Sequence, residues 1–241
     1  MTECCLGRLP VEPVDIGDLT YYLTEPLAPA PPTVTAPALT YPMACNDTIG
    51  DCTIAAVVHT DQATADLTTE PWTYPGDAAV SAEYFKLTGG QDTGLVETRV
   101  LRTWNQKAGL FGHELAAFAP LNVKHTKPIK QAVELCGAVY TGVLIPEPAQ
   151  QQFADGQPWA LTGTPADSQI EGGHAVPCVG YNATGPVFVT WGALQQATWE
   201  WWLTYGEECY AVITAEVKAR GELHSVDFAA LDKDLAALRA E

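Results

Sequence analysis

Apolar and polar residues recur along the chain in two rhythms, which together predict a mixed α+β protein. Apolar residues at helical spacing predict helices over residues 52–63, 77–87, 93–108 and 126–136. Short apolar or alternating runs predict strands over residues 138–145, 174–181, 186–191 and 210–215. A further helix is expected over residues 199–205, with Thr198 as its cap. Residues 148–167 carry no such pattern and are expected to form a loop.

Two of the predicted strands form a hairpin. Residues 174–181 and 186–191 are separated by the turn-forming sequence Asn182-Ala183-Thr184-Gly185. Such a hairpin would fold the second strand back along the first and bring Thr190 toward His174.

The N-terminal 44 residues do not resemble a folded domain. Six prolines lie between Pro26 and Pro42, and proline fixes φ and removes backbone donors. We therefore expect an extended, polyproline-like arm over residues 1–44. Three alternatives are open: a flexible leader, an arm that docks on its own domain or on a neighbouring subunit or assembly partner, and a segment that occludes a cleft.

The C-terminal tail, residues 216–241, has Phe228, Leu231, Leu235 and Leu238 at helical spacing. We expect an amphipathic helix there that packs on the domain, with a subunit contact as the alternative. The chain thus divides into an arm (1–44), a central domain (45–215) and a tail (216–241).

Composition and charge exclude several classes of function. The chain has 47% apolar residues and seven tryptophans, enough for a sizeable core. Its formal net charge of −17 repels phosphates, so neither a nucleic-acid partner nor a membrane partner is expected. An acidic N-terminus without a following apolar run does not fit a signal peptide. Seven cysteines, an odd number without small-scaffold spacing, favour synthesis in a reducing cytoplasm.

Candidate chemistry lies in two remote stretches. Cys52 follows a Gly50-Asp51 turn and begins a predicted helix, where free N–H groups and the helix dipole favour a thiolate. Asn46 stands six residues earlier and offers an amide donor. His174 begins a predicted strand, after Gly172-Gly173, which allow either a turn or the close approach of another backbone. A thiol, an imidazole and an amide are the components of nucleophilic acyl transfer.

These stretches resemble the signature blocks of papain-like cysteine peptidases. The matching residues are a Gly-x-Cys turn at Cys52 with an amide six residues before it, His174-Ala175-Val176, Val179-Gly180-Tyr181 and Trp191-Gly192, in the family's order. The resemblance implies a papain-like α+β fold, in which a helical subdomain carrying Cys52 packs on an antiparallel sheet or barrel subdomain carrying His174. It also implies that Cys52 is the nucleophile, that His174 is its base, and that Asn46 replaces the family's glutamine as the oxyanion donor.

The chain departs from the family at the residue that orients the histidine. Neither an asparagine nor an aspartate is present, and the spacing places Val189 or Thr190 there. Thr190 can accept a hydrogen bond from Nδ1–H, more weakly than a carboxylate would. Asp47 and Asp51 add negative charge near the thiol, which opposes thiolate formation. The nearest resemblance is to poorly characterised papain-like proteins of bacteria and their phages.

The sequence therefore supports two functions. The first is a thiol hydrolase or acyl-transfer protein that acts on peptide or isopeptide bonds of a protein substrate, active or weakly active, with Cys52 as its most reactive thiol. The alternative is a non-catalytic assembly protein on the same fold, such as a phage virion-associated protein, with the arm as its contact. No cofactor or metal is expected, because zinc-binding spacings, dinucleotide-binding glycines and a P-loop are absent from the sequence.

Overall fold

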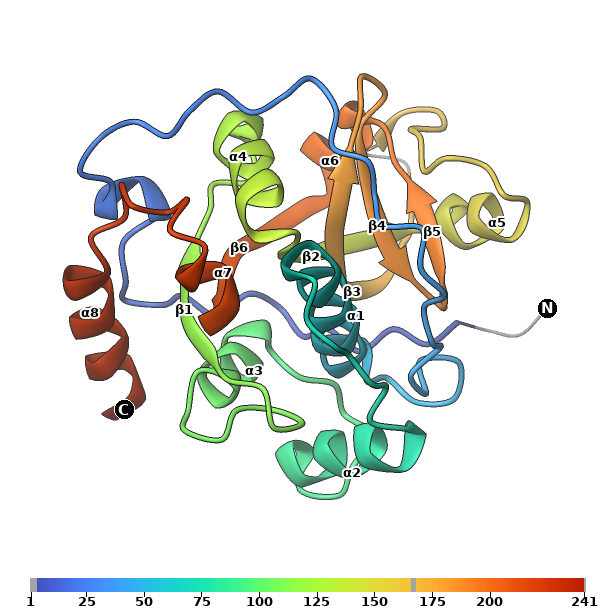
Figure 1. Cartoon of the computed structure of the whole chain (residues 1–241). Coiled ribbons are helices and arrows are strands. Elements are labelled where there is room, and N and C mark those ends of the chain that lie inside the picture. The colour runs from blue at the N-terminus through green and yellow to red at the C-terminus, as the bar shows by residue number, and fades with distance from the viewer. Residues whose placement is uncertain (1–3, 166–167, 241) are drawn as a thin grey trace.

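A computed structural model describes residues 4–165 and 168–240 of the chain (Figure 1). It confirms the α+β class. In the described part of the chain, one antiparallel sheet of six strands has the order β1-β6-β2-β3-β4-β5. The strands are β1 Leu115–Pro120, β2 Val139–Pro146, β3 Ile170–Tyr181, β4 Pro186–Thr190, β5 Ala193–Gln196 and β6 Gly206–Thr214. The helices are the 3-10 turn η1 Leu19–Tyr22, α1 Cys52–Thr68, α2 Asp77–Thr88, α3 Glu97–Trp104, α4 Thr126–Cys136, α5 Pro148–Ala154, α6 Trp199–Tyr205, α7 Ala215–Ala219 and α8 Phe228–Ala240.

Glycine and threonine residues at the ends of several helices act as the sequence pattern predicts. Gly89 and Gly137 end α2 and α4 in the left-handed conformation, as C-terminal glycines commonly do. The Thr198 side chain accepts a hydrogen bond from the Trp201 N–H and so caps α6. The amphipathic helix expected in the tail is α8, whose Leu231, Leu235 and Leu238 are buried in the main core.

Other elements differ from the sequence-based expectation. Strands β1 and β5 and helix α5 were not predicted, and α3 is shorter than residues 93–108 at both ends. Helix α3 cannot include Gly94, which has a positive φ of 75°. It ends before Asn105, whose side chain donates to the Leu115 carbonyl instead. Helix α5 begins with Pro148 at its first position, where proline is favourable because no N–H is needed.

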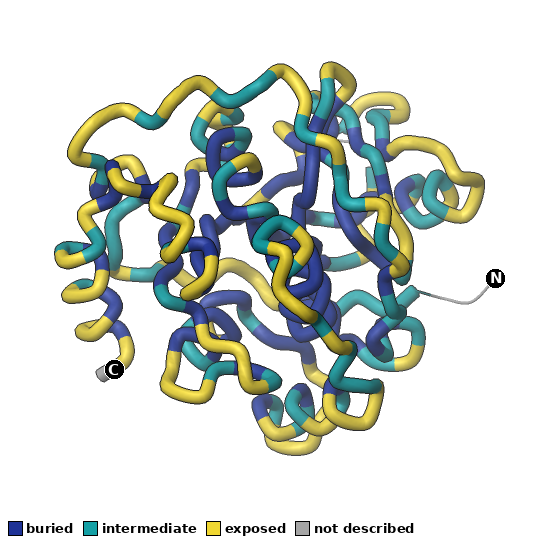
Figure 2. The backbone as a smooth tube through the Cα atoms, in the orientation of Figure 1, coloured by how far each residue is buried: buried dark blue, intermediate teal, exposed yellow. Residues whose placement is uncertain are grey.

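Helix α1 lies in the middle of the fold and is buried from Cys52 to Thr64 on all its sides (Figure 2). The sequence suggested a helix with one apolar face, whereas a helix covered all round is a core helix. It packs chiefly against β3. His59 is buried there, with Nε2 2.8 Å from the Pro42 carbonyl. Because α1 packs on β3, its first residue, Cys52, lies against the strand that carries His174.

The arm wraps around its own domain. Its first part crosses the molecule to η1, and the proline-rich part returns over α4 toward the sheet (Figure 1). Along the return, Gln131 of α4 donates to the Leu27 and Ala28 carbonyls, and Val34 pairs with Tyr181 of β3. Of the alternatives left open by the sequence, docking on the same chain is therefore observed.

An aromatic cluster supports the β3–β5 part of the sheet. Trp159 is fully buried, stacks on Trp201 at 4.7 Å and donates its indole N–H to the Ala149 carbonyl. It also contacts Phe188 and Trp191. Trp191 is in turn the neighbour of His174, so the cluster connects the core to the candidate site.

We expect Trp159→Ala to lower the free energy of unfolding by about 3–5 kcal/mol, because it leaves a large cavity and an unpaired carbonyl. Leu203→Ala, at a side chain 39% exposed, is the matched control and should change it by less than about 0.5 kcal/mol. Chemical denaturation measures both. Equal changes in the free energy of unfolding for the two variants would show that the aromatic cluster does not stabilise this part of the core.

Candidate functional site

The structure brings the Cys52 and His174 stretches together. Cys52 is the first residue of α1, and its Sγ accepts the N–H of Ala175 at 3.4 Å. Ala175 follows His174 on β3, so the thiol lies against the histidine's own strand. Nδ1 of His174 is buried and has no hydrogen-bond partner among the described residues. The thiol is therefore fixed against the backbone next to His174, and no hydrogen bond joins it to the imidazole among the described residues.

Thr190 reaches His174 across the predicted hairpin. Strands β3 and β4 pair antiparallel, and Thr190 Oγ1 lies 2.7 Å from Nε2 of His174. The expectation that Thr190 would contact Nδ1 was wrong, because β4 approaches the imidazole from its Nε2 side. Trp191 stacks on the same ring at 4.7 Å and fixes its plane. Val189, the other position considered, packs in a separate apolar cluster.

Asn46 is buried at the same end of α1. Its side-chain N–H donates to the Cys5 carbonyl at 3.2 Å and to the Ile49 carbonyl at 3.4 Å. The Cys5 N–H in turn donates to the Asn46 carbonyl. The amide expected to hold an oxyanion thus holds a backbone carbonyl from the chain's own N-terminus.

Residues 4–9, here called the N-terminal segment, lie over the thiol. The Arg8 N–H donates to the Gly173 carbonyl, and the Leu9 N–H donates to the Leu95 carbonyl. The Leu95 N–H donates back to the Gly7 carbonyl. The Gly7 backbone lies close enough to the Cys52 sulfur to lower the pKa of the thiol. The segment is therefore bonded to β3 on one side and to the chain before α3 on the other.

Glycines make this close approach possible. A Cβ on Gly7 would lie 1.7 Å from the Gly50 carbonyl oxygen, and one on Gly173 would lie 2.5 Å from the Arg8 oxygen. Of the two alternatives for Gly172-Gly173, close backbone approach is confirmed, since both glycines lie within β3.

The Arg8 side chain is buried among three carboxyl groups. Its guanidinium donates to Glu208 at 2.6 Å and also to Glu207. Glu97, at the start of α3, is 1% exposed and faces the same space. Burial, followed by the charge of Glu208, raises the pKa of Glu97 well above its usual value. Sequence reasoning missed this pocket, because Arg8, Glu97 and the Glu207-Glu208 pair lie in three remote parts of the sequence and no motif joins them.

The covered site favours the neutral forms of Cys52 and His174. Burial raises the pKa of Cys52 to about 12, against the lowering effect of hydrogen bonds from Ala175 and Gly7. Burial, and then the positive charge of Arg8, lowers the pKa of His174 to about 3. The expected thiolate at the start of α1 is therefore not favoured here, because loss of solvation outweighs the helix dipole.

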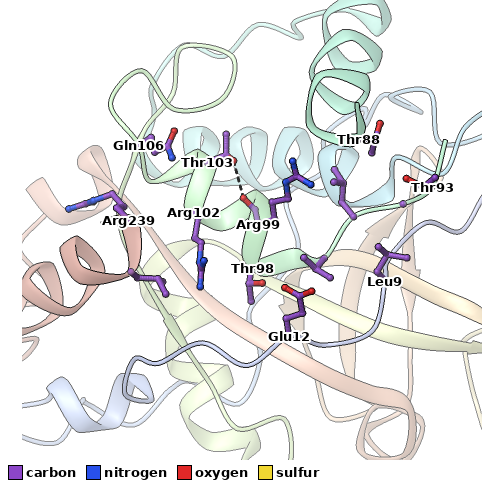
Figure 3. Close-up of a pocket in the computed structure, with 14 residues that line it drawn as sticks. Leu9, Glu12, Thr88, Thr93, Thr98, Arg99, Arg102, Thr103, Gln106 and Arg239 are labelled. Carbon is purple, nitrogen blue, oxygen red and sulfur yellow. Dashed lines mark hydrogen bonds between the residues drawn. The ribbon is translucent and has the colours of Figure 1, made fainter. Parts of the chain in front are cut away.

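Two cavities adjoin the N-terminal segment. One, of about 610 Å³, is an open groove between the Gly50 and Asp92–Gly94 loops and Gly172-Gly173. The other, of about 520 Å³, lies between α3 and α8, where Arg99, Arg102 and Arg239 gather and Leu9 and Glu12 of the arm reach the edge (Figure 3). Among residues 4–165 and 168–240, no cluster of histidine, cysteine or acidic side chains could hold a metal ion. No helix in that same part of the chain is long and apolar enough to cross a membrane.

Comparison with solved structures decides the fold. The chain is similar to xylellain, a cysteine protease from Xylella fastidiosa, with 16% identity and a TM-score of 0.63 over 88% of this chain and 97% of that one. The chain has the papain-like fold. It is also similar to procathepsin B S9 from Trypanosoma congolense, with 12% identity and a TM-score of 0.50 over 87% of this chain and 86% of that one. No family model and no curated protein sequence matches the chain.

Asp51, directly before Cys52, makes a pH dependence measurable. Its carboxyl is fully buried, and burial raises its pKa to about 8. The folded protein therefore holds a proton that the unfolded chain releases near pH 4, so this group's contribution to stability is lost as pH rises toward 8.

We expect Asp51→Asn, which keeps the shape without the charge, to melt close to the wild type at pH 5. By pH 8 it should melt about 5 °C or more above the wild type, because the folded wild type must then either bury a carboxylate or hold a proton that the unfolded chain has released. Melting temperatures at pH 5, 6, 7 and 8 measure the gap, and Asp155→Asn, in the exposed turn after α5, serves as the control. A gap that does not change with pH would contradict the buried, protonated carboxyl.

Proposed function

We propose that the protein is a thiol hydrolase of peptide or isopeptide bonds, held in a closed resting form by its own N-terminal segment. One observation carries the proposal: Thr190 orients His174 through Nε2, Nδ1 has no hydrogen-bond partner among the described residues, and the Cys52 thiol is fixed at the next residue of the same strand. An imidazole that donates Nε2–H to a hydroxyl presents a lone pair at Nδ1, the form that a general base needs.

The mechanism in the open form follows from these groups. Nδ1 of His174 takes the proton of the Cys52 thiol, and the sulfur attacks a substrate carbonyl carbon. The Asn46 amide and the Cys52 N–H, which is free of intrahelical partners at the helix start, stabilise the oxyanion. His174 then gives its proton to the leaving amine. Water, deprotonated by His174, hydrolyses the thioester and restores the thiol.

The closed form explains why the groups are neutral at rest. The N-terminal segment excludes water from Cys52, and Arg8 adds positive charge near His174. When the segment leaves, solvation lowers the pKa of the thiol and raises that of the imidazole. Residues 4–9 thus act as the occluding segment that was one of the three alternatives for the arm.

Gly7→Ala tests the closed form directly, because the added Cβ would collide with the Gly50 carbonyl and prevent docking. We expect iodoacetamide to modify Cys52 in this variant at least about tenfold faster than in the wild type at pH 7.5, since exposure restores thiolate character. Mass spectrometry of peptides quantifies the rate. Val11→Ala, an exposed position of the same arm, should react like the wild type.

Hydrolysis of fluorogenic peptide amides then separates opening from catalysis. Activity should appear in Gly7→Ala and disappear in Gly7→Ala/Cys52→Ala. Fast modification of Cys52 without hydrolysis of any peptide in a broad panel would refute the proposed hydrolase activity. It would still support the closed form.

Thr190→Val, made in the Gly7→Ala background, tests the orienting contact. Replacing the aspartate of a serine triad costs about 10⁴ in kcat, and a neutral hydroxyl holds the ring less strongly, so we expect a loss of about 10- to 100-fold in kcat. KM should change little, and Thr190→Ser should restore most of the activity. Equal kcat values for the three proteins would show that Trp191 stacking alone orients His174.

The alternative function is a non-catalytic assembly protein on the papain-like fold, for example one incorporated in a phage virion. What supports it is the threonine in place of a stronger orienting group and the closed cleft. Unchanged assembly and function in Cys52→Ala would favour this alternative.

A further inference from the structure

We infer that the space filled by the Arg8 side chain is an arginine-recognition pocket, and that the peptides bound by the open protein carry an arginine there. This inference rests on the proposed function for its substrates. The pocket is formed by Glu97, Glu207, Glu208 and Gly142.

The pocket is built around a guanidinium. Two carboxyl groups accept its N–H donors from different sides, Glu208 at the buried end and Glu207 nearer to solvent. Tyr210 donates its hydroxyl to the other oxygen of Glu208 at 2.9 Å, which fixes that carboxylate in place. A planar group with donors along its edges matches this arrangement better than an ammonium does.

Gly142 of β2 provides the room. A Cβ at this position would lie 2.7 Å from Cδ of Arg8, 2.7 Å from Oε1 of Glu97 and 2.8 Å from Cγ of Glu208. Any other residue would therefore fill the space in which the three side chains meet. The pocket depends on a missing side chain in the middle of the sheet.

The third carboxyl group points to a ligand rather than to simple packing. Within residues 4–165 and 168–240, neither oxygen of the buried Glu97 side chain, which faces Arg8, has a hydrogen-bond partner. One arginine thus lies among three acids, two of which are nearly inaccessible to water. When Arg8 leaves with the N-terminal segment, these acids repel one another in a poorly solvated space, so the empty pocket favours a new cation.

The position of the pocket connects it to the candidate site. Arg8 donates its N–H to Gly173, the residue before His174, and Gly7 contacts the Cys52 sulfur. A side chain in this pocket therefore belongs to a residue whose backbone lies beside the reacting groups. A ligand peptide would pair with the Gly173 and Leu95 backbones, as the N-terminal segment does, and gain specificity from its arginine.

A binding measurement tests the pocket without any need for hydrolysis. The protein is the full chain with Gly7→Ala, Arg8→Ala and Cys52→Ala, which keeps its own segment out and prevents turnover. The probe is a fluorescein-labelled hexapeptide with the sequence of residues 4–9, with serine at both cysteine positions. A second probe has citrulline, the neutral isostere, in place of arginine. Fluorescence anisotropy gives both dissociation constants.

We expect the citrulline peptide to bind at least about 30-fold more weakly, since it leaves buried carboxylates without a charged partner. Adding Glu208→Gln should reduce this ratio to less than about threefold, while Glu114→Gln, an exposed position before β1, should leave it unchanged. Equal binding of the two peptides, or no binding of either, would overturn the inference. The comparison of peptides uses one protein, so it does not depend on the folding of the Glu208 variant.

Kinetics then distinguishes this inference from the proposed function. If Gly7→Ala/Arg8→Ala hydrolyses peptide amides, those with arginine near the scissile bond should have a kcat/KM at least about tenfold above their citrulline counterparts. Selective binding of arginine peptides without hydrolysis would support the arginine-recognition pocket and refute the proposed hydrolase activity. Hydrolysis at equal rates for arginine and citrulline peptides at every position tested would refute arginine recognition by the pocket and support the proposed hydrolase activity.

Discussion

The buried ion pair between Arg8 and two glutamates of β6, Glu207 and Glu208, is the interaction on which the closed form depends. A guanidinium removed from water is stable only with well-placed acceptors, and Glu207 and Glu208 provide them. The ion pair holds the N-terminal segment between β3 and Leu95. That segment in turn covers Cys52 and occupies the Asn46 amide. One side chain thus connects the arm, the sheet and the candidate site.

The same arginine links occlusion to the state of the reacting groups. Burial, and then the charge of Arg8, lower the pKa of His174, while burial raises the pKa of the Cys52 thiol. Proton transfer between the two is therefore disfavoured at rest. The His174–Thr190 contact and Trp191 stacking belong to the sheet and its core, so they persist when the segment leaves. In this account opening changes solvation and leaves the orienting framework intact.

Features that depend on neighbouring residues could be predicted from the sequence. Features that depend on contacts between distant residues could not. Cys52 at a helix start, the β3–β4 hairpin that carries Thr190 to His174, and the glycines beside His174 follow from short patterns. Which imidazole nitrogen meets Thr190 depends on the approach of β4, and the orientation of a ring has no sequence signal. The thiolate expected at Cys52 is disfavoured for a similar reason, because residues 4–9 cover the thiol and burial raises its pKa. Nothing local marks Arg8 as the partner of Glu208, 200 positions away.

Amide hydrogen exchange at Arg8 and Leu9 tests the central claim most directly. In the wild-type chain these N–H groups donate to Gly173 and Leu95, and a closed resting form requires that they exchange slowly. We predict protection of at least about 100-fold relative to an unstructured peptide of the same sequence, together with protection of the Leu95 N–H that bonds Gly7. Exchange of Arg8 and Leu9 at the unstructured rate, with β3 still protected, would show that the cleft is open at rest and would contradict the account.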